Sequence, residues 1–214
     1  MKKEFSGFRI LQFVEIPVFL WIAEISEYHS ISKWIETLDI SEISCYHSFK
    51  FAHNARNFVA RRFFARLCLN SIGCFDLNNN SFQFSDYGKP FLKNSECHFS
   101  WASSKNHIAL AASQKFPVGI DIECIDKDFD IEHLWSKVSG NDDCDKDHEN
   151  FFRFWTAREA IAKLTGTGLN EDILNLKLQL SKSHQRISIK CPNNISIRQF
   201  KTAGFIISIA HHSP

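Results

Sequence analysis

The chain has 214 residues, of which 44% are hydrophobic and 23% are charged, and this composition excludes a disordered or fibrous protein. Its 25 Lys and Arg nearly balance its 24 Asp and Glu, which leaves a formal net charge of +1. That balance argues against the broad cationic surface of a general nucleic-acid binder. We therefore expect no nucleic-acid partner.

The sequence also lacks the patterns of a membrane or secreted protein. A membrane span needs roughly 20 consecutive apolar residues, whereas Glu15 and Glu24 interrupt the apolar run near the N-terminus. No clear small-residue cleavage site of a secretory signal follows that run. The seven Cys residues are odd in number and form no C-x-x-C pair, so we expect no disulfide scaffold. These features predict a reduced, cytoplasmic chain without a membrane partner.

The first half of the sequence combines helices with short strands. Its predicted elements are a buried strand at 16–25, helices at 32–38 and 54–69, and a hairpin of strands 97–101 and 107–113. Gly88 and Pro90 indicate a turn just before the hairpin. The segment 114–117 is the best candidate for a linker.

The second half follows the same plan. Its predicted elements are a strand at 117–123, a helix at 150–165, and strands at 174–180, 187–190, 195–200 and 205–210. Gly166 is a plausible C-cap of the helix, and the acidic segment 139–149 is typical of a surface loop. Since each half contains helix and several short strands, the sequence predicts an α+β fold of two similar lobes, 1–115 and 116–214.

Asp121-Ile122-Glu123 is the first candidate for chemistry. Residues two apart on a strand share a face, so both carboxylates point the same way, while Ile120 and Ile122 point into a core. Like charges on one face repel unless a cation lies between them, and Mg²⁺ prefers oxygen ligands. Taken alone, the motif is more typical of two solvated acids on an exposed strand, because exposed acids are common.

The helix 150–165 is the second candidate. Thr156, Glu159 and Lys163 fall in one narrow sector of a helix that is otherwise largely apolar. An acid and a lysine on a buried helix are costly unless they are paired or used. The simpler interpretation is an i,i+4 ion pair of about 0.3–0.5 kcal/mol.

Two further motifs are weaker. Lys89 in the turn could meet a phosphate as a point charge, but on its own it is much more typical of a solvated turn lysine. The Gly166-Thr167-Gly168 segment could approach a ligand, but a helix cap followed by a turn also accounts for it. The sequence contains no zinc-type spacing, P-loop, G-x-S-x-G or Rossmann glycine pattern.

In this order, the motifs resemble those of the 4′-phosphopantetheinyl transferase superfamily, of the surfactin-synthetase-activating type. The matching segments are G-K-P-F-L at 88–92, His98 and Phe99 in the hairpin, V-G-I-D-I-E at 118–123, F-W-T-A-R-E-A-I-A-K at 154–163 and G-T-G-L at 166–169. The resemblance extends from about residue 45 onward. It is carried mainly by two independent motifs, G-I-D-I-E and W-T-x-R-E-A-x-x-K, at the appropriate separation.

The resemblance implies a pseudo-twofold monomer of two α+β lobes with coenzyme A and Mg²⁺ between them. The implied reaction moves 4′-phosphopantetheine from coenzyme A to a serine of an acyl or peptidyl carrier protein and releases 3′,5′-ADP. The implied metal ligands are Asp121, Glu123 and Glu159. Glu159 would also help to deprotonate the carrier serine, and Lys163 would neutralise or protonate the leaving phosphate. The implied coenzyme A contacts are Arg56, Lys89, Pro90, Ser103 and Arg158.

One departure from the family pattern lies in the hairpin. The family usually carries a histidine there that touches a coenzyme A phosphate, whereas an ungapped alignment gives Ser103. A hydroxyl carries no charge, so we expect weaker phosphate binding. Arg158 replaces the commoner lysine and keeps its charge.

These departures leave an alternative to the active enzyme. The alternative is a weakened or inactive homologue that acts as a carrier-protein or coenzyme-A-binding module. A metal-dependent nuclease also uses clustered acids and a lysine, but the basic groove it needs is not predicted.

Overall fold

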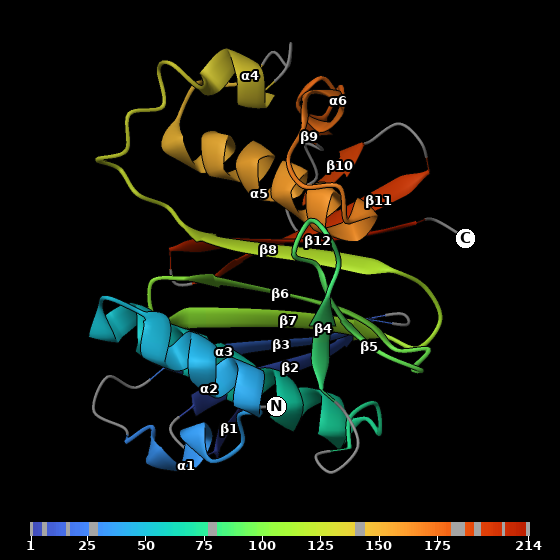
Figure 1. The fold of residues 1–214 in the computed structure, drawn as a ribbon. Coiled ribbons are helices and arrows are strands. Elements are labelled where there is room, and N and C mark those ends of the chain that lie inside the picture. Colours follow the sequence, from blue (N-terminus) through green and yellow to red (C-terminus); the bar gives the residue numbers. More distant parts are fainter. Residues whose placement is uncertain are drawn as a thin grey trace.

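Two five-stranded antiparallel sheets pack face to face, and a long helix covers the outer side of each (Figure 1). This computed structural model describes residues 2–5, 8–15, 18–25, 30–76, 81–139, 144–180, 187–190, 194–202 and 204–212. For 2–5, 8–15, 180 and 187–190 it describes the backbone alone. The mixture of packed helices and antiparallel strands confirms the predicted α+β class.

The first sheet has the order β1-β2-β3-β7-β6 and the second has the order β8-β12-β11-β10-β9. The strands of the first are β1 (Lys2–Phe5), β2 (Phe8–Glu15), β3 (Val18–Ile25), β6 (His98–Ser104) and β7 (His107–Ser113). Those of the second are β8 (Val118–Cys124), β9 (Gln179–Leu180), β10 (Ile187–Lys190), β11 (Ile195–Thr202) and β12 (Phe205–His212). A short ribbon pairs β4 (Phe82–Phe84) with β5 (Pro90–Leu92).

The helices lie mainly on the two outer faces (Figure 1). They are α1 (Ser32–Ile35), α2 (Ile40–Ser48), α3 (Ala52–Ser71), α4 (Trp135–Ser139), α5 (His148–Thr165) and α6 (Glu171–Leu174). Helix α3 packs on the first sheet and α5 packs on the second, and an apolar core fills each of these two interfaces. A third core lies between the sheets and includes Ile120 and Ile122 of β8, which is the inward face that the alternating pattern predicted.

The core between the sheets joins both halves of the chain, since Leu20 and Ala109 pack there with Ile120 and Ile207. The first sheet uses residues up to Ser113 and the second uses residues from Val118. The division into 1–115 and 116–214, and its pseudo-twofold symmetry, stay predictions.

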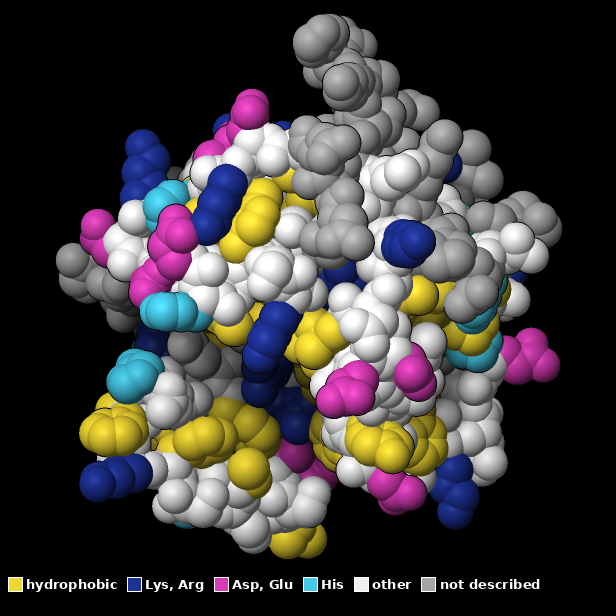
Figure 2. Space-filling view, turned by 90° about the horizontal axis from the view of Figure 1, so that it is seen from above, with side chains coloured by type: hydrophobic (Ala, Val, Ile, Leu, Met, Phe, Trp, Pro, Cys, Tyr) yellow, Lys and Arg dark blue, Asp and Glu magenta, His cyan; other side chains and the backbone are white. Residues whose placement is uncertain are grey.

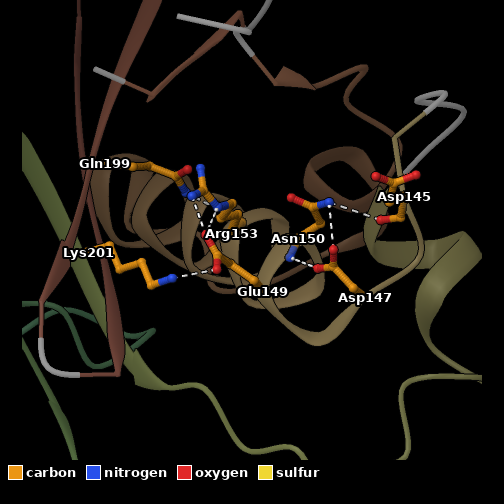
Figure 3. Close-up of polar contacts among 7 residues, drawn as sticks. All are labelled: Asp145, Asp147, Glu149, Asn150, Arg153, Gln199 and Lys201. Carbon is orange, nitrogen blue, oxygen red and sulfur yellow. Dashed lines mark hydrogen bonds and ion pairs between the residues drawn. The ribbon is translucent and has the colours of Figure 1, made fainter. Parts of the chain in front are cut away.

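The N-terminus of α5 is fixed by polar contacts that set the position of the whole helix (Figure 3). The Asp147 side chain accepts the backbone N–H of Asn150 at 2.7 Å, which satisfies an N–H that the first turn leaves without a helical partner. Glu149 pairs with Arg153 and with Lys201 of β11. Helix α5 is therefore tied to the second sheet at its first turn.

Further along, α5 lies directly on β8 at Gly119. A Cβ atom added to Gly119 would lie 2.0 Å from the backbone oxygen of Ala160 and 2.4 Å from the nitrogen of Leu164. Only glycine allows this approach. At the other end, Gly166 adopts a left-handed conformation with φ of 72° and donates its N–H to Ala162, which confirms the predicted C-cap.

Most of the predicted elements are confirmed, with shifts of a few residues at their ends. The strand predicted at 174–180 is largely wrong, because Asn170 caps the short helix α6 and only Gln179–Leu180 form a strand. Helix α2 was missed, although Asp39 and Glu42 form a capping box at its start. Strands β1 and β2 and helix α4 were also not predicted. Of the loop predicted at 139–149, residues 140–143 lie outside the described residues, as do 16–17 of the first predicted strand.

Among the helices that the structure describes, none combines the length and the apolar character needed to cross a bilayer. Acidic and basic side chains are interspersed on the face seen from above in Figure 2, so no patch of a single sign covers the described part of that face.

Candidate functional site

The predicted motifs meet in a cleft of about 530 Å³. Five regions of the chain line it: α3, the β4–β5 ribbon with its turn, β6, β8, and α5 with the loop after it. The charged residues in its lining are Arg61, Arg62, Lys89, Asp121, Glu123, Glu159 and Lys163. The aromatic ones are Phe84, Tyr87, Trp101 and Trp155. Acids, cations and aromatic rings therefore share one concave surface, as expected of a site for a charged ligand with an aromatic base.

Asp121 lies at the bottom of this cleft. Its side chain is 5% exposed, and Oδ1 accepts a hydrogen bond from Nζ of Lys163 at 2.6 Å. Its other oxygen, Oδ2, is buried and has no hydrogen-bond partner among the described residues. Burial raises the pKa of Asp121 to about 7 despite Lys163, and the negative charges of Glu123 and Glu159 contribute to the rise. The second, unpaired oxygen is free to receive a cation.

Glu123 lies two residues further along β8 and faces the same cleft. Its Oε2 accepts a hydrogen bond from Oγ of Ser104 at 2.7 Å, and the same Ser104 oxygen accepts the backbone N–H of Cys124. Burial is the main cause that raises the pKa of Glu123, with Glu159 adding to it. Ser104, which the sequence analysis did not single out, therefore joins the first sheet to a carboxylate of the second.

The three carboxylates fit a divalent cation by their chemistry, although Asp121 already accepts a hydrogen bond from Lys163 and Glu123 accepts one from Ser104. Asp121, Glu123 and Glu159 line one cleft, and carboxylate oxygens are what Mg²⁺ prefers. The buried, unpartnered Oδ2 of Asp121 supports the fit. Among the described residues, however, no three His, Cys, Asp or Glu side chains are grouped closely enough to enclose a metal ion. The predicted Mg²⁺ site therefore stays a proposal.

Lys89 reaches the cleft from the turn after β4. Its Nζ donates to the backbone oxygen of Leu164 at 2.8 Å, close to the C-terminal end of α5. Burial lowers the pKa of Lys89 to about 8. The alkyl chain of Lys89 packs near Gly166, and Pro90 and Gly168 line the same part of the cleft. Lys89 and Leu164 are 75 residues apart in sequence, and their contact brings the turn and the end of α5 together at one wall.

Two of the predicted coenzyme A contacts lie outside the residues that line the cleft. Arg158 is completely buried, and its guanidinium donates to the backbone oxygens of Val138, Ile173 and Leu176. It satisfies carbonyls near the ends of α4 and α6, and its contact with a phosphate stays a prediction. Because apolar residues lie all around α5, the sequence does not indicate which face of this helix is turned toward the cleft.

Arg56 is the second of these residues, and its contact with coenzyme A also stays a prediction. Its guanidinium lies 5.8 Å from the centroid of the Trp34 ring, and the residue does not line the cleft. The arginine that α3 supplies to the cleft is Arg61, whose Nη1 donates to Oγ of Ser103 at 3.2 Å. The sequence placed Arg61 outside the apolar stripe of its helix, but a helix pattern does not tell which polar residues face a cleft and which face solvent.

Comparisons with known proteins agree with this arrangement. Residues 117–210 match the family model described as the 4′-phosphopantetheinyl transferase superfamily. A Candida glabrata relative named L-aminoadipate-semialdehyde dehydrogenase-phosphopantetheinyl transferase is 31% identical over 130 residues. The 4′-phosphopantetheinyl transferases HetI of Nostoc sp. and Sfp of Bacillus subtilis are 27% and 28% identical over 166 and 138 residues.

These matches extend over only part of each protein. They cover 52%, 71% and 60% of this chain and 50%, 70% and 60% of the Candida, Nostoc and Bacillus proteins, in that order. The matched family segment contains β8 and α5, and therefore all three carboxylates and Lys163. These matches support the resemblance of the chain to the 4′-phosphopantetheinyl transferase superfamily.

Proposed function

We propose that this chain transfers the 4′-phosphopantetheine group of coenzyme A to a serine of an acyl or peptidyl carrier protein and releases 3′,5′-ADP. The observation that carries the proposal is the convergence of Asp121 and Glu123 of β8 with Glu159 and Lys163 of α5 in one cleft. The same cleft contains Lys89 and Arg61, which suit the phosphates of coenzyme A. The relatives' names and the family description support the same activity.

Asp121, Glu123 and Glu159 are the residues that would hold Mg²⁺. When bound, this cation neutralises charge on the pyrophosphate of coenzyme A. The buried Oδ2 of Asp121, without a partner among the described residues, is the oxygen best prepared for it. The rings of Trp101 and of the other aromatic residues in the cleft offer faces on which the adenine can stack.

The protein side chains account for the proton and charge movements of the transfer. The carrier serine oxygen forms a bond to the phosphorus that bears pantetheine, and the bridging P–O bond of the pyrophosphate breaks. Glu159, directly or through water, accepts the serine proton. Lys163 keeps two N–H donors beyond the one it gives to Asp121, so it can neutralise or protonate the leaving phosphate of 3′,5′-ADP.

One assay tests the proposed activity. The chain is incubated with Mg²⁺, coenzyme A and a panel of apo carrier proteins, and each carrier is weighed by intact mass spectrometry. The expected result is a gain of one phosphopantetheine on at least one carrier. The gain should disappear with EDTA or when the acceptor serine of that carrier is replaced by Ala. Absence of any gain across carriers of fatty acid, polyketide and peptide type would contradict the proposal.

The second candidate function is a binding module without transferase activity, and Ser103 is the observation that favours it. A serine stands where the family resemblance expects a phosphate-binding histidine. Binding of coenzyme A together with no transfer in the same assay would support this candidate over the first.

A monomeric state and a cytoplasmic location complete the proposal. Sedimentation analysis tests the first, and the location of a tagged chain in its own cell tests the second.

A further inference from the structure

Helix α3 carries Arg61, Arg62 and Arg66, and the last two are neutralised by one buried glutamate. Arg62 and Arg66 both pair with the buried carboxylate of Glu42, at 3.2 and 2.6 Å. The guanidinium of Arg62 also lies 4.6 Å from the centroid of the Phe84 ring and 4.7 Å from that of Trp101. These contacts make Arg62 and Arg66 part of the packing between α2, α3 and the β4–β5 ribbon.

Arg61 differs from both, because its charge has no acidic partner among the described residues. It lines the cleft and donates through Nη1 to Oγ of Ser103 on β6. Its Nε is buried and has no hydrogen-bond partner in the described part of the chain. Burial lowers the pKa of Arg61, which reflects the cost of removing this guanidinium from water.

Removing a cation from water without a counter-charge costs free energy. A bound anion would offset this cost. The planar guanidinium presents several N–H donors in a geometry that fits phosphate oxygens. Ser103 extends the same donor set: its oxygen accepts from Arg61, which leaves its own O–H free to donate outward. Together the two side chains form a small anion site in the wall of the cleft.

We propose that Arg61, with Ser103 beside it, binds a phosphate group of coenzyme A. The inference rests on the proposed function for its ligand. It also changes the expectation drawn from the sequence: the charge that a histidine on β6 would supply comes instead from the neighbouring helix α3, so Ser103 does not by itself weaken phosphate binding.

Isothermal titration of coenzyme A into the full chain tests this assignment. Arg61→Gln is expected to weaken coenzyme A binding about 10- to 100-fold, because a hydrogen-bonded charge is lost. Arg61→Lys should retain part of the affinity. Lys146→Gln is the matched control, since it removes one charge from a surface lysine that pairs with Glu132 outside the cleft, and it should bind like the wild type. Equal affinity of wild type and Arg61→Gln, with unchanged thermal unfolding, would overturn the inference.

A second titration identifies the phosphate. Dephospho-coenzyme A lacks the 3′-phosphate but keeps the pyrophosphate. If Arg61→Gln and the wild type bind it equally well, Arg61 contacts the 3′-phosphate, and if the loss persists, Arg61 contacts the pyrophosphate. Each of these results, after a loss with coenzyme A, supports the site.

A rescue experiment separates a binding role from a structural one. Ser103→His in the Arg61→Gln background places a new cationic group beside the lost one, and at mildly acidic pH it should recover part of the coenzyme A affinity. No recovery would mean that the anion does not lie between residues 61 and 103, which contradicts the assignment.

The outcomes distinguish a failure of the proposed transferase function from a failure of the Arg61 assignment. If the wild type does not bind coenzyme A at all, the transferase proposal falls and this inference falls with it. If the wild type binds and transfers but Arg61→Gln behaves identically, only the inference is wrong.

Discussion

Lys163 of α5 donates a hydrogen bond over 2.6 Å to Asp121 of β8, two residues that lie 42 positions apart in the chain. The contact joins the helix to the strand at the base of the cleft, where Asp121 is buried and Lys163 is partly exposed. The same contact therefore contributes both to the packing of the second lobe and to the charge distribution of the proposed site.

Removing Lys163 should destabilise the protein. Lys163→Ala leaves the buried Asp121 without its cation, and we expect unfolding to become easier by about 1–3 kcal/mol in chemical denaturation. The double variant Asp121→Asn with Lys163→Met removes both charges and should be less destabilised than the sum of the two single variants. Strict additivity would show that the two side chains do not stabilise one another.

Glu159→Gln should abolish transfer and leave the fold intact. The amide keeps the size of the side chain but cannot accept the serine proton, and loss of a general base costs about 10²- to 10⁴-fold in rate. Initial rates of holo-carrier formation by mass spectrometry measure the effect. Glu132→Gln is the matched control, because this glutamate pairs with Lys146 on the surface outside the cleft. Unchanged turnover in Glu159→Gln would contradict the assigned role.

Gly119→Ala should displace α5 from β8. The added methyl would lie 2.0 Å from the oxygen of Ala160, and overpacking of this kind costs about 3 kcal/mol. Gly73→Ala is the control: its φ of 73° makes alanine strained, but no atom lies within 4 Å of the new Cβ, so the expected loss is about 1 kcal/mol. Thermal unfolding compares the two variants. Equal melting temperatures would mean that α5 tolerates a wider spacing from the strand.

Binding of 3′,5′-ADP should weaken at alkaline pH because of Lys89. Burial lowers the pKa of Lys89 to about 8, so above that pH the free protein loses the ammonium that binds phosphate. The ligand phosphates stay fully ionised, since their second pKa is about 6. His98 is the titratable neighbour of Lys89, and its pKa is lowered by burial and by Lys89, so it is already neutral in this range.

Titrations from about pH 7 to about pH 9.5 check the dependence on Lys89. The affinity of the wild type should fall more steeply across the range than that of Lys89→Arg, because arginine keeps its charge. The deprotonation of Asp121, whose pKa is about 7, weakens phosphate binding in both proteins. A wild-type affinity that does not change with pH would exclude Lys89 from the phosphate site.

The local pattern of the sequence was sufficient to predict β8 of the second sheet and its covering helix α5. Alternation along β8 placed Asp121 and Glu123 on one face and Ile120 and Ile122 in the core between the sheets, because the side-chain period of a strand is two. The helix α5 and its Gly166 cap followed from apolar spacing and from the one residue type that adopts the left-handed conformation easily. Such features depend on neighbours within a few residues.

The surroundings of the helix arginines could be determined only from the tertiary structure. Arg56, Arg61 and Arg158 all lie on predicted helices, yet the first stacks on Trp34, the second faces the cleft, and the third is buried among backbone carbonyls. Their long side chains can reach partners in several directions, and those partners come from segments remote in sequence. The sequence alone indicated β8 and α5 and showed which two carboxylates of β8 share a face. Only the packing of two sheets and two helices decided which cations meet those carboxylates, because that choice depends on contacts made after the chain has folded.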